Sequence, residues 1–256
     1  MKSIITKADY FFAEMFHKLY LWGGEFTNIL MRVISFIGEY GVVFLLIGMG
    51  LALFKRTRKI GGTIILSIAI GFVISNVLLK NIVQRVRPFQ ANSQFELWWA
   101  GSNGHYESGY SFPSGHVTAS MAFAMAVMLT TNKKYNWPIM FLPLIMASSR
   151  IYLMVHYFSD CFGGFAVGFV SGILAYVILN WIYKSKIGLF VWIRELDLFK
   201  SKSSKSKSSS PKHIEEPEQP SFPEVYVPQS EEGESSTTLI KQKTNETDEQ
   251  ENMNNK

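Results

Sequence analysis

The chain has 256 residues, a net charge of +5 and 48% hydrophobic residues, values that an ordinary soluble domain can also reach. Its single cysteine, Cys161, excludes an internal disulfide. No basic stripe is interleaved with aromatic residues, so we expect no nucleic-acid partner.

The first predicted element covers residues 1–40. Within 8–38, apolar residues such as Phe11 and Phe12 are interrupted by charged ones, and Gly23-Gly24 breaks the run. We predict amphipathic helices that lie at the membrane interface. A membrane span in this segment is the alternative.

Five membrane spans are predicted next, because an apolar helix needs about 20 residues to cross a bilayer. Two uncharged runs have that length and three shorter runs are plausible spans; the five cover 41–54, 60–79, 117–131, 137–149 and 161–183. The predicted fold class is therefore all-α, a polytopic transmembrane helix bundle. It occupies residues 41–186 with five spans, and a span within 8–38 would make six.

The basic residues predict the orientation of this bundle. Clusters follow the first, third and fifth spans; they contain Lys55, Arg56, Arg58 and Lys59, then Lys133 and Lys134, then Lys184 and Lys186. All lie on one side if the helices alternate, and the positive-inside rule makes that side cytoplasmic. We therefore predict a multi-pass protein of the cell membrane whose loop 80–116 and turn 150–160 face outward.

The C-terminal part is predicted to leave the membrane. Residues 187–199 combine apolar residues with Trp192 and Arg194 and predict an interfacial helix. Residues 200–256 are dominated by Ser, Glu, Gln, Asn and Lys, which is typical of a disordered segment. We expect a cytoplasmic tail.

Three polar clusters interrupt the apolar pattern on the predicted outer side. They are Lys80 with Arg87 and Pro88, then Pro113-Ser114-Gly115-His116, then Ser149-Arg150 with His156 and Asp160. Charged residues at the edge of a membrane helix are costly and therefore indicate function.

Each spacing suggests a chemical use. His156 and Asp160 are four residues apart, so on a helix their side chains meet. The carboxylate would accept one ring N–H and leave the other ring nitrogen as a nucleophile. Ser114-Gly115 at a helix start would offer backbone N–H groups to an anion.

The remaining residues suit the transfer of a phosphoryl group. Lys80 and Arg87, seven residues apart, can share one helix face. Together with Arg150 they can neutralise the phosphoryl oxygens. His116 is then left to protonate the departing oxygen as a general acid.

Less specific interpretations were weighed for the same residues. Lys80 and Arg87 alone could be interfacial anchors, and His116 alone could be a packing histidine. Arg85 lies off the predicted shared face, and the sequence leaves open whether it has a structural or lipid-headgroup role or none. The aromatic residues of 89–111 suit an interfacial belt or a rim around the substrate; they include Trp98, Trp99, Tyr106 and Tyr110.

In series, the three clusters resemble the signature motifs of the type 2 phosphatidic acid phosphatase superfamily. The resemblance implies an α-helical membrane fold and a phosphohistidine on His156, oriented by Asp160, with His116 as acid. It implies a phosphate pocket of Lys80, Arg87, Ser114, Gly115 and Arg150, with no metal and no cofactor. Substrates of bacterial members are undecaprenyl diphosphate, phosphatidylglycerophosphate or phosphatidate.

The functional prediction is thus a metal-independent lipid phosphatase whose partners are a lipid phosphate and the bilayer. The alternative is a lipid phosphotransferase that uses the same intermediate. A non-catalytic lipid-binding protein would be expected to lack the nucleophile or the acid, and both are present. Neither the particular lipid nor the oligomeric state is predicted.

Overall fold

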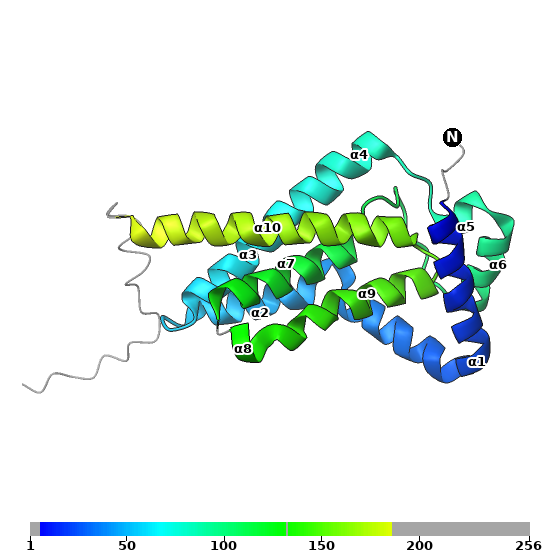
Figure 1. Ribbon diagram of the computed structural model, residues 1–256, viewed down its shortest axis with the longest axis horizontal. Helices are drawn as coiled ribbons and strands as arrows, with labels where there is room; N and C mark the ends of the chain where they lie inside the picture. The colour runs from blue at the N-terminus through cyan, green and yellow to red at the C-terminus, as the bar shows by residue number, and fades with distance from the viewer. Residues whose placement is uncertain (1–5, 132, 186–256) are drawn as a thin grey trace, which may run out of the picture. The chain divides into compact units, whose positions relative to one another are not determined.

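The computed structural model describes residues 6–131 and 133–185, and all regular structure in these two ranges is helical (Figure 1). The predicted all-α class is therefore confirmed for this part of the chain. The predicted interfacial helix 187–199 and the predicted tail 200–256 lie outside the described residues.

The elements follow one another in a simple order. They are α1 (Lys7–Ile37), η1 (Glu39–Gly41), α2 (Val42–Leu53), α3 (Arg58–Phe72), the π-helical η2 (Val73–Leu79), α4 (Lys80–Val83), α5 (Pro88–Ala91), α6 (Ser93–Gly101), α7 (Gly115–Thr130), α8 (Lys133–Asn136), η3 (Trp137–Met140), α9 (Phe141–Tyr152) and α10 (Phe158–Lys184).

Two stretches of the described residues are long and apolar enough to cross a membrane, Arg58–Ala91 and Phe158–Lys184. They contain the predicted spans 60–79 and 161–183. α1 and α2 together pass the same test as a pair bent by 46°, and α7 is a shorter apolar helix. The spans predicted at 41–54, 117–131 and 137–149 are helical for most of their length, and their crossing of the bilayer stays a prediction.

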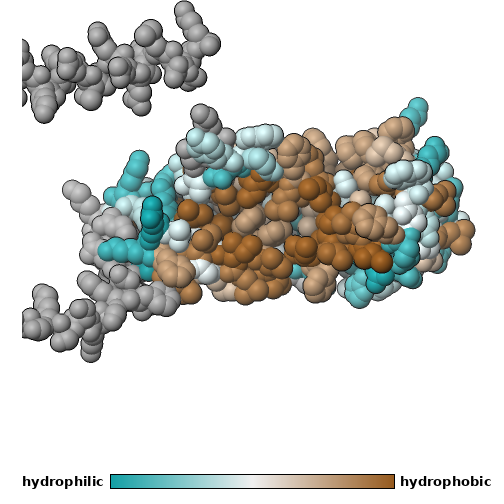
Figure 2. Space-filling model, turned by 90° about the horizontal axis from the view of Figure 1, so that it is seen from below, coloured by the Kyte–Doolittle hydropathy of each residue, from teal (hydrophilic) through white to brown (hydrophobic). Residues whose placement is uncertain are grey.

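The surface supports a membrane location. Figure 2 shows a broad hydrophobic face between two more hydrophilic ends. On α10, Phe162, Val177 and Trp181 are exposed although they are large and apolar. Such side chains are stable at a surface that lipid covers, and we describe the chain as a membrane protein.

α1 begins with a capping box and is broken in its middle. The Thr6 side chain accepts a hydrogen bond from the Asp9 N–H, and the Asp9 carboxylate accepts one from the Thr6 N–H. Gly24 has φ 55° and ψ −145°, which is outside the helical region. The interruption predicted at Gly23-Gly24 is confirmed, and glycine tolerates the positive φ because it has no Cβ.

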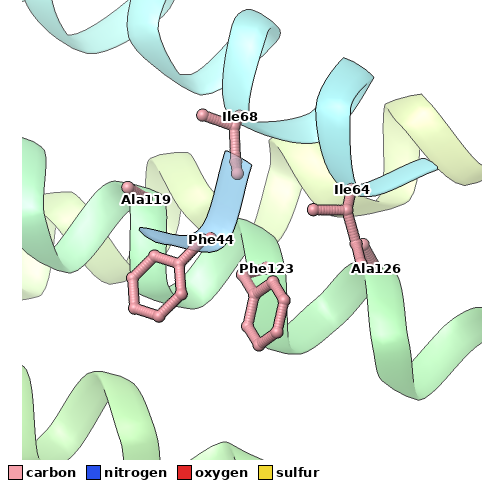
Figure 3. Close-up of a cluster of buried hydrophobic side chains, with 6 residues drawn as sticks. All are labelled: Phe44, Ile64, Ile68, Ala119, Phe123 and Ala126. Atoms are coloured by element: carbon pink, nitrogen blue, oxygen red, sulfur yellow. The ribbon is translucent and has the colours of Figure 1, made fainter. Parts of the chain in front are cut away.

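α7 is the central helix of the described part and packs against α3, α9 and α10. One side of it contributes to a buried cluster with α2 and α3 (Figure 3), formed by Phe44, Ile64, Ile68, Ala119, Phe123 and Ala126. The Phe44 and Phe123 rings stack with centroids 4.9 Å apart.

Glycines on α10 bring this helix close to α7. A Cβ at Gly164 would lie 2.7 Å from the Ser114 carbonyl oxygen, and one at Gly168 would lie 2.6 Å from that of Thr118. Small residues at four-residue intervals allow membrane helices to approach in this way. The contact sets Ser114, at the start of α7, beside Asp160, one turn before Gly164.

Candidate active site

A cavity of about 1240 Å³ brings most of the predicted site residues together. Its lining includes Lys80, Arg87, Gly115, His116, Arg150 and His156. Ser114 and Asp160 are fully buried behind this lining. Residues from α1, α3 and η2 complete the wall.

Lys80 and Arg87 reach the cavity by a route that differs from the predicted one. The helix that carries Lys80 ends at Val83, because Gln84 adopts a left-handed conformation with φ 50°. Arg87 is extended, with φ −68° and ψ 155°, as expected for a residue before proline. The prediction that both cations share one helix face is wrong, although both line the cavity.

Arg87 is held by backbone carbonyl groups. It is 2% exposed. Its Nε donates to the Gly109 carbonyl at 3.0 Å, its Nη1 to that of Val155 at 3.0 Å and its Nη2 to that of Ser108 at 3.3 Å. These bonds fix the guanidinium with Nη1 3.3 Å from Nε2 of His156.

The contact with Arg87 identifies the protonation of His156. A guanidinium has donors and no acceptor, so we assign Nε2 as the acceptor in this contact, without a hydrogen. In the neutral ring the hydrogen is then on Nδ1. Burial lowers the pKa of His156 well below its usual value, and the charges of Arg87, Arg150 and Lys80 lower it further. A neutral imidazole with a free electron pair on Nε2 can act as a nucleophile.

Asp160 lies behind His156. Its Oδ2 is 3.7 Å from Nδ1 of His156, longer than a hydrogen bond, and accepts one from the Tyr157 N–H at 2.9 Å. His156 lies in the turn before α10, which begins at Phe158, so the two residues do not share a helix as predicted. The turn still brings the carboxylate to the proton-bearing side of the ring.

The predicted anion seat at Ser114-Gly115 is only partly formed. α7 begins at Gly115 as predicted, and Gly115 and His116 line the cavity. The Ser114 N–H, however, donates to the Asp160 carbonyl at 3.0 Å and is therefore unavailable to an anion. Ser114 joins α7 to α10 rather than facing the cavity. A Cβ at Gly38 would lie 3.3 Å from Cδ2 of His116, so the end of α1 packs against this histidine.

Arg150 is buried near the end of α9 and connects the cavity to two other segments. It is 2% exposed. Its Nη1 donates to the Ser35 hydroxyl of α1, and its Nη2 forms an ion pair with Glu107. Sequence reasoning assigned no role to Glu107, because its loop contains no recognisable motif.

Glu107 lies where an anionic ligand would be expected. Its Oε2 is 2.9 Å from Nη1 of Arg87 and 3.9 Å from Nε2 of His156. Its side chain is 20% exposed, whereas that of Arg87 is 2% exposed. A carboxylate and a phosphate bind arginine in the same planar, two-pronged way. The cavity therefore has the chemistry of an oxyanion site.

A second group of charges, which the sequence did not reveal, lies behind Asp160. Nη1 of Arg85 donates to Oδ1 of Asp160 at 2.6 Å, and Nη2 of Arg85 donates to Oδ2 of Asp9 at 2.8 Å. Asp9 and Arg85 are 76 residues apart in the chain, so no local spacing relates them.

Metal-ligating side chains are scattered over the part of the chain that the structure describes. Within residues 6–131 and 133–185 no three His, Cys, Asp or Glu side chains gather as ligands, and a reaction without metal stays a prediction. Cys161, the single cysteine of the sequence, is buried beside the Ala147 carbonyl.

Comparison with known proteins agrees with this arrangement. The sequence model described as "PAP2 superfamily" matches residues 60–184. The chain is 30% identical over 150 residues to the undecaprenyl-diphosphatase BcrC of Bacillus subtilis, an alignment that covers 58% of this chain and 74% of that protein. It is 32% identical over 143 residues to an undecaprenyl-diphosphatase of Sulfolobus acidocaldarius, which covers 54% of this chain and 66% of the relative.

A solved structure supports the fold. The transmembrane PAP2-type phosphatidylglycerolphosphate phosphatase of Bacillus subtilis superposes with a TM-score of 0.53 at 23% identity, over 70% of this chain and 90% of that one. Fold, motif residues and sequence similarity lead to one assignment. This chain belongs to the PAP2 superfamily.

Proposed function

We propose that this protein hydrolyses the phosphate or diphosphate group of a membrane lipid through a phosphohistidine on His156. The two relatives are named as diphosphatases, so hydrolysis of a lipid diphosphate or phosphate is the reaction class that they support. The observation that carries the mechanism is the contact between Nε2 of His156 and Arg87, 3.3 Å apart at the cavity wall, from which we infer that Nε2 is unprotonated.

The first step forms the phosphoenzyme. The electron pair of Nε2 attacks phosphorus and the bond between phosphorus and the leaving oxygen breaks. His116, which takes up a proton when the anionic phosphate binds among the cavity cations, gives that proton to the leaving oxygen. Arg87, Arg150 and Lys80 neutralise the phosphoryl oxygens as the bond breaks. Asp160, 3.7 Å from Nδ1, stabilises the positive charge that the ring acquires.

The second step releases phosphate. Water attacks phosphorus while His116, now neutral, accepts a proton from that water. The bond between phosphorus and Nε2 breaks and returns the electron pair to His156. Inorganic phosphate leaves, and His116 is again protonated for the next cycle.

The cavity wall supports a lipid substrate. Besides its cations it contains apolar side chains, and those of Val33 and Phe36 on α1 and of Phe72 on α3 are also exposed at the surface. A phosphate head can thus bind His156 while its chain extends toward lipid. The candidates are undecaprenyl diphosphate, phosphatidylglycerophosphate and phosphatidate, of which the first is the substrate that the named relatives suggest.

One assay tests the reaction and the lipid together. Purified protein in detergent is offered the three candidate lipids in parallel with a chelator present, and free phosphate is measured. We expect release from at least one lipid, with undecaprenyl diphosphate fastest. His156→Ala should lose essentially all turnover, and labelled phosphate should be trapped on His156 alone.

Other outcomes of this assay would contradict the proposal. Label on another residue would remove His156 as the nucleophile. Activity that the chelator abolishes and magnesium restores would contradict a mechanism based on fixed cations. Label that passes to an added acceptor without free phosphate would identify a phosphotransferase.

We also propose that the active site faces outward, on the basis of the basic clusters at the opposite ends of the helices. A cysteine that replaces exposed Ser93 on α6, in a Cys161→Ser background, should react with an impermeant thiol reagent in intact cells. A cysteine at exposed Lys55 should react only after permeabilisation. The reverse labelling would place the site in the cytoplasm and contradict the proposed orientation.

A further inference from the structure

The carboxylate behind His156 is itself held by a second ion pair. Asp160 accepts from Arg85 through Oδ1 at 2.6 Å, while its Oδ2 accepts from the Tyr157 N–H at 2.9 Å and faces Nδ1 of His156. Each oxygen therefore has a different partner. Rotation of the carboxylate about its own axis would break both bonds.

Arg85 is held in turn from its far side. Its Nη2 donates to Asp9 on α1 at 2.8 Å, and its Nη1 also donates to the Ser159 hydroxyl at 2.6 Å. The guanidinium lies 4.0 Å from the centroid of the Tyr157 ring, a cation–π contact. With these contacts the arginine has little freedom to move away from Asp160.

Asp9 is as completely bonded as Asp160. Its Oδ1 accepts from the Ser159 N–H and hydroxyl, both at 2.8 Å, and its Oδ2 also accepts from the Thr6 N–H at 3.1 Å. The side chains of Asp9 and Asp160 are 0% exposed and that of Arg85 is 11% exposed. A buried carboxylate is tolerated only with such partners.

The charges of Asp9, Arg85 and Asp160 suit the positive charge that forms on His156 during the reaction. A lone Arg85 would neutralise Asp160 and weaken the attraction of that carboxylate for a positive imidazole. Because Asp9 shares the same guanidinium, two negative charges face one positive charge. The excess of one negative charge lies on the side of His156 where the ring becomes positive when Nε2 is phosphorylated.

We propose that Asp9 and Arg85 are positioning residues that fix Asp160 and preserve its negative charge toward His156. The N-terminal helix α1 thereby contributes to catalysis through Asp9, without touching the substrate. This inference rests on the proposed function, in which His156 is the nucleophile. Carboxylates that orient a metal-ligating histidine are worth about 10- to 100-fold in metal affinity or activity, and we expect a similar magnitude for this reactive histidine.

The test compares three variants with a matched control. Asp9→Asn removes one charge at nearly constant shape, Arg85→Lys keeps the charge but not the forked geometry, and Ser159→Ala removes only the bridging hydroxyl. The control is Glu14→Gln on the same helix, whose carboxylate forms an exposed pair with Lys18 at 3.0 Å. Turnover of p-nitrophenyl phosphate is measured, together with competitive inhibition by inorganic phosphate.

We expect kcat to fall about tenfold or more for Asp9→Asn and Arg85→Lys, and about threefold for Ser159→Ala. KM and the inhibition constant for phosphate should change by less than about twofold, because the cations of the cavity are untouched. Glu14→Gln should behave as wild type. A purely structural role of the cluster would instead weaken phosphate binding in parallel with kcat, and that result would overturn the inference.

His156→Ala, assayed alongside, separates this inference from the proposed function. If His156→Ala retains turnover, the phosphohistidine mechanism is wrong, and the inference fails with it. If His156→Ala is inactive while all three variants keep wild-type kcat, the proposed function stands and the positioning role alone is refuted. If Asp9→Asn and Arg85→Lys do not fold, the kcat of Ser159→Ala still tests the positioning role.

Discussion

The two sides of the His156 ring differ in how their charges are balanced. On the cavity side the lining carries more cations than carboxylates, Arg32, Lys80, Arg87 and Arg150 against Glu39 and Glu107, and Glu107 pairs with Arg87 and Arg150. On the opposite side, Arg85 alone lies between Asp9 and Asp160. Glu107 is 20% exposed, whereas the two aspartate side chains are 0% exposed.

The difference shows which side is built to receive a ligand. An excess of fixed cations beside a cavity is complementary to an anion that comes from outside. The opposite cluster is buried and its carboxylates already have hydrogen-bond partners. It can therefore only hold the His156 ring in place and polarise it. His156 lies between them, with Nε2 toward the cations and Nδ1 toward the carboxylates. One ring thus joins a binding side to a supporting side.

Among the residues on the two sides of His156, the largest effect is expected from Arg87→Lys, on the cavity side. Lysine cannot keep the three carbonyl contacts of Arg87 and also approach Nε2, because an ammonium lacks the forked geometry. We expect kcat/KM to fall about 100-fold. This is the typical loss when an enzyme loses one fixed hydrogen-bond donor to the charge that develops in the transition state. The measurement is steady-state hydrolysis in detergent, with thermal unfolding as the control for folding.

Comparison with Ser159→Ala on the supporting side makes this prediction sharper. That variant should lose several-fold less activity than Arg87→Lys, since it removes one neutral donor and leaves every charge in place. Equal losses on both sides would contradict the division of the site into a binding side and a supporting side.

The sequence alone predicted the binding side better than the supporting side. Lys80, Arg87, His116, Arg150 and His156 lie in motifs, and all of them line the cavity. Their local geometry was predicted less well. The left-handed residue Gln84 ends the helix, and a turn rather than a helix carries His156. Such single-residue changes of chain direction leave no periodic signal in a sequence.

The supporting side depends on tertiary contacts that no spacing encodes. Asp9 is one of the charged residues in the segment 8–38, and the structure shows that it accepts a hydrogen bond from Arg85, 76 residues away. The capping box of Thr6 and Asp9 is a local role of the same carboxylate and gives no sign of this distant partner. Glu107 was missed because loop conformation alone brings it to Arg87 and Arg150.

A smaller effect is expected from pH. Protonated His156 has no electron pair on Nε2, and burial together with Arg87 and Arg150 holds its pKa well below 6.5. Hydrolysis of p-nitrophenyl phosphate should therefore persist at pH 6.5 and decline only in more acidic solution, after correction for ionisation of the substrate. An acid limb centred at or above pH 6.5 would show that the cations do not keep the ring neutral.

The same shift has a consequence for stability. In the unfolded chain the ring takes up a proton near pH 6.5, whereas folded His156 stays neutral, so protonation favours unfolding. This contribution should be absent above pH 6.5, grow as the pH falls through that value and level off below the folded pKa. Thermal midpoints of wild type and His156→Ala, compared across pH, isolate it.

The smallest effect is expected from Glu107→Gln. The carboxylate bonds to Arg87 and forms an ion pair with Arg150, two cations that a substrate phosphate would also use, so the phosphate must displace it. When only a fraction of the protein has a free site, the apparent affinity falls by that fraction. A neutral amide competes less well, and we expect phosphate to inhibit about threefold more strongly, with kcat nearly unchanged.

A matched control is Glu96→Gln, which removes an exposed carboxylate from α6 without touching the cavity cations. If both variants strengthen phosphate binding equally, the effect is a general loss of negative charge and Glu107 has no special place. If Glu107→Gln weakens binding, Glu107 helps to arrange the arginines rather than competing for them. A stronger effect at Glu107 alone is the result expected of a carboxylate that occupies the binding side, because only there do ligand and protein compete for the same cations.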